Sequence, residues 1–66
     1  MNSLQIETFI SVVKYNGFTE AARERFVTQP SISKQIKNLE DELDVVLIER
    51  EGKGIKLTKA GKEFWL

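Results

Sequence analysis

The sequence predicts a mainly α fold in which three helices precede a two-stranded β-hairpin and the start of a C-terminal helix. Three observations support this prediction. Apolar residues recur at helical spacing in three segments before residue 44. A β-branched run, a turn with two glycines and an alternating segment follow between residues 45 and 57. The chain has 66 residues, so one small core must hold every element.

The first helix is expected over about residues 4–15. Ser3 is the expected N-cap, because a serine oxygen can accept a hydrogen bond from a free amide group of the first turn. Asn16 and Gly17 should end the helix, since both tolerate the left-handed conformation that closes one. The apolar residues that share one face, and that we expect to be buried, are Ile6, Phe9, Ile10 and Val13.

The second helix is short, over about residues 20–26, and Thr19 can cap it. The small side chains of Ala21 and Ala22 allow another helix to approach closely. Phe26 lies four residues after Ala22, so we expect it to be buried on the same side. Val27 then falls in a tight connection to the third helix.

The third helix opens at Thr28, a good N-cap, with Pro30 in the first turn, where a missing N–H costs nothing. It should end near Asp44. The apolar stripe expected to face the core consists of Ile32, Ile36, Leu39 and Leu43.

The remaining segment predicts a hairpin and a further helix. Residues 45–48 are β-branched and apolar, residues 51–54 contain two glycines, and residues 55–57 alternate as a returning strand does. Thr58 can cap the last helix, which begins at residue 59. The residues of that helix expected to pack on the core are Ala60 and Phe64.

Two helices joined by a tight turn form a helix-turn-helix, whose second helix lies in the DNA major groove with its N-terminal residues at the base edges. The third helix suits this role, because no acid occurs from Gln29 to Asn38 and the helix dipole is positive at that end. Gln pairs with adenine, Lys reaches guanine, Ser bonds either kind of group, and a Pro ring can touch a thymine methyl. Singly such residues also just solvate a helix, but their grouping favours base reading. The candidates are Gln29, Pro30, Ser31, Ser33, Lys34 and Lys37.

Charge is unevenly distributed along a chain whose ten basic and ten acidic residues cancel. Zero net charge by itself argues against nucleic-acid binding. However, residues 23–37 and 52–66 each carry four basic residues and one acid, whereas residues 38–51 carry six acids and one arginine. The hairpin cations Arg50, Lys53 and Lys56 either lie beside a phosphate chain or minor groove, as a wing does, or keep a sheet edge soluble. Arg50 is the strongest wing candidate, because Arg is favoured in narrow minor grooves.

Composition argues against several other classes. Without Cys or His, the chain has no thiolate or imidazole for a metal site or general base. Ser31 and Ser33 therefore have no His partner, and the adjacent acids 40–42 spread around a helix instead of converging. We expect no enzyme, cofactor or metal. No apolar run is long enough to span a bilayer, and the first residues do not form a signal peptide, so the expected location is the cytoplasm.

Several segments match one known family of regulators. They are Leu4 with Phe9, Gly17-Phe18-Thr19-x-x-Ala22, Thr28-Gln29-Pro30-Ser31-Ile32-Ser33-Lys34-Gln35-Ile36-x-x-Leu39-Glu40-x-x-Leu43, Leu47-Ile48-x-Arg50 and Leu57-Thr58-x-Ala60-Gly61. With these, the chain resembles the N-terminal winged helix-turn-helix domain of LysR-type transcriptional regulators over essentially its whole length. The Gln-Pro-Ser-x-Ser and Leu-Thr-x-Ala-Gly segments are highly specific together.

The resemblance implies that residues 1–58 bind double-stranded promoter DNA, with a recognition helix over about 29–43 and a wing over about 50–54. Residues 59–66 would begin a linker helix that dimerises the full-length protein, whose effector-binding domain is absent here. The family's major-groove positions match Gln29, Pro30, Ser33 and Lys34. Its wing positions match Arg50 and Lys53, and positions near phosphates match Thr19 and Thr28.

Two residues depart from the family pattern. Asp44 stands where the family usually has Gly, which should weaken the helix end. Ile48 stands where the family usually has Phe, which alters packing under the wing. The alternative function is a winged-helix module for protein interaction or dimerisation, since fold alone does not fix function. Such a surface would expose aromatic or apolar anchors where this chain has residues 29–34.

Overall fold

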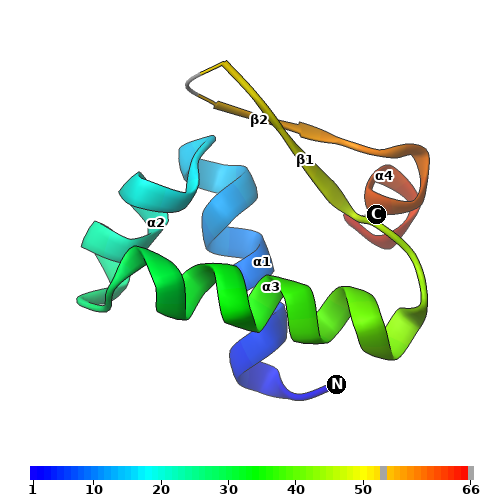
Figure 1. Cartoon of the computed structure of the whole chain (residues 1–66), viewed down its shortest axis with the longest axis horizontal. Coiled ribbons are helices and arrows are strands. Elements are labelled where there is room, and N and C mark those ends of the chain that lie inside the picture. The colour runs from blue at the N-terminus through cyan, green and yellow to red at the C-terminus, as the bar shows by residue number, and fades with distance from the viewer. Residues whose placement is uncertain (53, 66) are drawn as a thin grey trace.

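Within the part of the chain that the structure describes, four helices and one hairpin follow each other in the predicted order (Figure 1). The computed structural model describes residues 1–52 and 54–65. In Figure 1, α2 and the start of α3 lie at one end of the molecule and α4 at the other, while the hairpin tip reaches back toward α2. The elements are α1 (Ser3–Tyr15), α2 (Phe18–Arg25), α3 (Gln29–Leu43), β1 (Ile48–Glu51), β2 (Gly54–Leu57) and α4 (Lys59–Trp65).

Asn2, and not Ser3, caps α1. The Asn2 side chain accepts a hydrogen bond from the Gln5 N–H at 2.9 Å, and the Gln5 side chain accepts one from the Asn2 N–H at 3.2 Å. This reciprocal pair satisfies two amide groups at once, which a cap at Ser3 does not achieve with the residues available. The predicted end is confirmed, because Asn16 adopts φ 52° and closes the helix.

The buried face of α1 is rotated from the predicted one. Phe9 and Val12 are fully buried, whereas Ile10 is 43% exposed, so the prediction for Ile10 was wrong. Polar Gln5 and Thr8 complete the buried stripe at helical spacing with Phe9 and Val12. Considering apolar residues alone misses this face, because three of the five buried residues of α1 are polar.

The second helix begins earlier and ends differently than predicted. Phe18 is its first residue and lies in the core, so Thr19 stands inside the first turn and is not the cap. Phe26 was expected to be buried, but it is 95% exposed. It adopts φ 57° as the C-cap residue of α2, and this left-handed conformation turns its side chain away from the Ala22 face.

The third helix follows the prediction at both ends. The Thr28 hydroxyl accepts a hydrogen bond from the Ser31 N–H at 3.3 Å, and Pro30 lies in the first turn. Asp44 closes the helix at φ 56°, so Asp provides the left-handed residue for which Gly would be the easier choice. The buried residues of the stripe are Ile32, Ile36 and Leu39, with Leu43 partly buried against them.

The first strand lies three residues later than predicted. Val45 and Val46 are 41% and 57% exposed and precede the strand, while β1 pairs antiparallel with β2 in the register Ile48↔Leu57 and Arg50↔Ile55. The apolar run misled the prediction, because the first strand consists of buried Ile48 followed by three exposed charged residues.

Glu40 fixes the point at which the chain enters the hairpin. Its carboxylate accepts hydrogen bonds from the N–H groups of Leu47 at 2.7 Å and Ile48 at 3.2 Å. Leu47 is 1% exposed, so its amide needs a partner within the protein. A residue of α3 thereby satisfies two amide groups at the start of β1.

The last helix closes the core as predicted. Thr58 caps it by accepting a hydrogen bond from the Gly61 N–H at 3.0 Å, and Phe64 packs edge-on against Phe9 with ring centroids 5.3 Å apart. The Trp65 ring also meets Phe9 at an edge, 6.1 Å away, yet Trp65 is 43% exposed. Within the described part of the chain, no helix has the length and apolar character needed to cross a membrane.

Candidate nucleic-acid interface

The predicted base-reading residues lie on the outer surface of α3. Burial of Ile32, Ile36 and Leu39 holds one side of the helix against the core. Among the residues on the other side, Gln29 and Ser33 are half-buried near the hairpin, and those exposed to solvent are Pro30, Ser31, Lys34 and Lys37. The first ten residues of this helix therefore offer amide, hydroxyl and ammonium groups and no carboxylate, next to the positive end of the helix dipole.

Three predicted site residues from two elements are joined by hydrogen bonds. Gln29 Nε2 donates to Ser33 Oγ at 2.9 Å. Arg50 Nη2, from β1, donates to the same Ser33 Oγ at 3.1 Å. The hairpin thus touches the recognition helix through its arginine, at a residue predicted to read bases.

The Phe18 ring packs against the Arg50 guanidinium. The Arg50 guanidinium carbon lies 4.2 Å from the centroid of the Phe18 ring, a cation–π arrangement. Phe18 is 9% exposed, so the ring is part of the core and offers one face to the guanidinium. The sequence alone did not identify this role of Phe18, because Phe18 and Arg50 are far apart in the sequence and no local pattern indicates that they meet.

The two threonines predicted near phosphates lie in different places. Exposed Thr19 lines a small hollow of about 110 Å³ between the start of α2 and the hairpin, and Arg50 and Gly52 form part of its wall. Thr28 is also exposed, but its hydroxyl already serves as the cap of α3. The structure therefore brings Thr19 and Arg50 together, and it leaves Thr28 at the helix start. The predicted wing residue Lys53 lies outside the described residues.

The cationic side chains differ in whether they form ion pairs within the protein. Arg23 and Lys37 form exposed pairs with Glu20 at 3.4 Å and with Asp41 at 3.1 Å, and such pairs exchange readily with other anions. Lys34 is exposed and takes part in no ion pair among the residues described.

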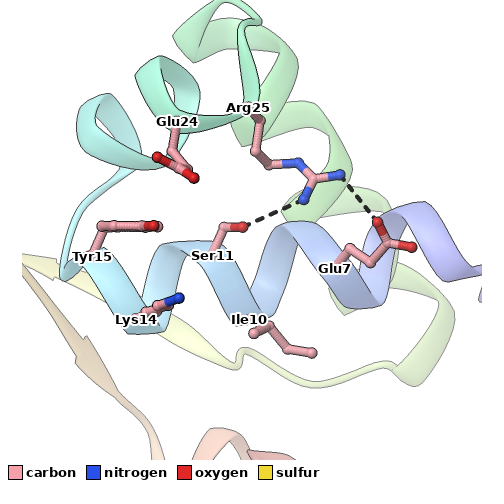
Figure 2. A pocket seen from close by; sticks show the side chains of 7 residues that line it. All are labelled: Glu7, Ile10, Ser11, Lys14, Tyr15, Glu24 and Arg25. Carbon is pink, nitrogen blue, oxygen red and sulfur yellow. Dashed lines mark hydrogen bonds and ion pairs between the residues drawn. The ribbon is translucent and has the colours of Figure 1, made fainter.

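Arg25 is engaged by side chains of α1. Figure 2 shows its guanidinium bonded to Ser11 and Glu7 of α1, at 3.4 Å and 3.5 Å. It lies in an open hollow of about 420 Å³ between α1 and α2 that contains none of the predicted site residues. Its charge is therefore directed to α1. The described residues contain no group of side chains suited to hold a metal ion.

Comparison with known proteins gives consistent matches over nearly the whole chain. Residues 4–62 match the model of the bacterial regulatory helix-turn-helix protein, lysR family. The chain is 44% identical over 59 residues to a RuBisCO operon transcriptional regulator of Allochromatium vinosum, covering 89% of this chain and 20% of that protein. It is 46% identical over 65 residues to the HTH-type transcriptional regulator YtlI of Bacillus subtilis, covering 98% and 21%.

Solved structures match equally well. The CbnR DBD in its complex with DNA superposes with a TM-score of 0.92 at 42% identity, covering 97% of this chain and 74% of that one. The BenM DBD with benA site 1 DNA gives a TM-score of 0.92 at 38% identity, covering 98% and 73%. The chain spans about a fifth of the length of the curated relatives it matches.

Proposed function

Because the chain belongs to the lysR family of bacterial regulatory helix-turn-helix proteins, we propose that it binds specific sequences of double-stranded promoter DNA within a transcription regulator. One observation carries this proposal. The N-terminal turns of α3 present Gln29, Ser33 and Lys34 on a surface without carboxylates, while the core fixes the opposite side of the helix. Two relatives of known structure, at 42% and 38% identity, are complexes with DNA.

In this proposal α3 lies in the major groove and the hairpin lies at the backbone or minor groove. Gln29, Pro30, Ser33 and Lys34 face base edges, with Ser31 and Lys37 beside them. Thr19, Thr28, Arg50 and Lys53 lie near phosphates. Phosphate contacts set the position of the protein on the duplex, and base contacts set its sequence preference.

The proposed arrangement of the whole protein follows the family. Residues 1–58 form the DNA-binding unit, and residues 59–66 begin a helix that joins two copies into a homodimer. Trp65 supports this, because an aromatic residue in α4 remains 43% exposed. Since the proposed partner is promoter DNA, the protein acts in the cytoplasm, as a regulator and not as an enzyme.

Phe26 favours a second candidate, a protein-interaction module. It is 95% exposed and precedes Val27, which is 44% exposed, in the turn between α2 and α3. Aromatic side chains exposed in this way are typical anchors of protein contacts. The two functions differ in one outcome, since a module of this second kind has no preferred DNA sequence.

Selection from a random pool of duplex DNA tests the proposal. The 66-residue chain is expected to enrich one sequence motif, and binding to it should weaken steeply with salt. Each neutralised phosphate contributes about 0.9 to the log–log slope, so we expect a slope of about −3 to −5 per domain. A flat salt titration together with an unenriched pool would reject DNA binding.

A further inference from the structure

The Ser33 hydroxyl accepts hydrogen bonds from two side chains, one on its own helix and one on the hairpin. Gln29 Nε2 lies 2.9 Å from its hydroxyl oxygen, and Arg50 Nη2 lies 3.1 Å from the same atom. A serine hydroxyl has two acceptor lone pairs and one O–H donor. With both lone pairs engaged, the group that Ser33 can still offer to a bound molecule is its O–H.

A hydroxyl restricted to donating recognises base edges differently from a free one. In the major groove guanine presents N7 and O6, adenine presents N7, and thymine presents O4, all of which are acceptors. Cytosine presents its N4 amino group, which is a donor. A donor-only Ser33 therefore finds an acceptor on three of the four bases and none on cytosine, so cytosine is disfavoured at the position that Ser33 contacts. A free serine hydroxyl, which can also accept, does not make this distinction.

Arg50 is well placed to maintain this restriction. Its guanidinium lies on the face of buried Phe18, which limits where it can move. A guanidinium has five N–H donors, so its bond to Ser33 leaves others for a phosphate oxygen. Gln29 likewise keeps its carbonyl oxygen and a second N–H for an adenine.

We propose that Arg50 is a positioning residue for base recognition: it keeps Ser33 in a donor-only state, so that a base offering an acceptor is preferred opposite Ser33 and cytosine is disfavoured. This inference rests on the proposed function, and it adds a sequence preference to it. It assigns to the hairpin arginine an effect on specificity in addition to the wing contact expected of it.

The test compares motifs selected from a random duplex pool by the 66-residue chain and by three variants. Arg50→Met removes the donor and keeps an apolar chain over Phe18. Lys56→Met is the matched control, because Lys56 is an exposed cation of the same hairpin, paired in register with Glu49. Ser33→Ala identifies the motif position that Ser33 reads. Thermal unfolding of each variant checks that it is folded.

The expected result is that wild type disfavours cytosine at the position identified by Ser33→Ala, and that Arg50→Met accepts it there. In direct titration, the affinity ratio against a cytosine-substituted duplex should fall about two- to tenfold, as expected for one hydrogen bond. Lys56→Met should weaken binding to all duplexes and leave the ratio unchanged. If Arg50→Met still disfavours cytosine, or if wild type accepts cytosine at that position, the inference is wrong while DNA binding stands. If wild type enriches no motif, the proposed function itself fails.

Discussion

Replacing Gly61 by alanine is expected to destabilise the domain by about 3 kcal/mol, at the upper end of the range for overpacking a core. Helix propensity alone predicts that Gly61→Ala stabilises the domain, because alanine is ordinarily the better residue in a helix. The expected change in the free energy of unfolding has the opposite sign. The reason is the close approach of α4 to the chain before β1. A methyl group at Gly61 would overlap the carbonyl oxygen of Leu47 and come within 3.1 Å of the Leu57 side chain.

The obstacle at Gly61 is backbone, which cannot rotate aside as a side chain does. The Leu47 carbonyl also accepts the Thr58 N–H at 3.0 Å, so moving it breaks the connection between the hairpin and α4. Urea unfolding of Gly61→Ala measures the effect, with Lys62→Ala on the exposed side of the same helix as the control. Equal or greater stability of Gly61→Ala would show that α4 does not pack as described.

Replacing Glu40 by alanine is expected to cost about 2 kcal/mol of unfolding free energy, because hydrogen bonds to charged groups contribute about 1.5–3 kcal/mol each and Glu40 is partly exposed. The change leaves the N–H groups of Leu47 and Ile48 without their carboxylate acceptor. Leu47 is almost fully buried, so water cannot replace that bond without opening the core.

Asp41 is the matched control for Glu40. It is the next residue, it is also acidic, and it forms an exposed pair with Lys37 at 3.1 Å. Such a pair contributes about 0.3–0.5 kcal/mol, so Asp41→Ala should have a small effect in the same urea titration. Similar losses in the two variants would contradict a specific role of the Glu40 carboxylate at the amides of Leu47 and Ile48.

The elements that could be predicted from sequence are those with strong local signals. Helix α3 has a cap at Thr28, a proline in its first turn and a regular apolar stripe, and its bounds and buried face were predicted correctly. Thr58 likewise marked the start of α4. These features depend on residues within about four positions of each other, which is the range that helix geometry couples.

The errors occurred where tertiary contacts override local patterns. Phe26 was expected in the core, but it occupies the left-handed position between two helices, and Phe18 fills the core instead. Val45 and Val46 were assigned to a strand, but the amide contacts of Glu40 delay the strand to Ile48. After buried Ile48, β1 consists of three exposed charged residues, so it carries no apolar alternation that could have shown its start.

The individual residues of the candidate site could be predicted from the sequence, but not all of the hydrogen bonds between them could. Gln29 and Ser33 are four positions apart on one helix, so their contact follows from helix geometry. Arg50 is 17 positions from Ser33, and its bond to that residue follows from the way the hairpin lies beside the start of α2. The dual engagement of Ser33 therefore emerges from the three-dimensional structure alone.

The placement of α3 at the base edges is tested by the ratio of the affinities for the selected duplex and for a scrambled duplex of equal length, measured for wild type and Gln29→Ala. If α3 reads bases from its N-terminal end, Gln29→Ala should lower this ratio. The difference in binding free energy between the two duplexes should shrink by about 1–3 kcal/mol, the contribution of one bidentate base contact. Binding to the scrambled duplex should change little, because phosphate contacts supply it. An unchanged ratio in Gln29→Ala would contradict the placement of this helix at the base edges.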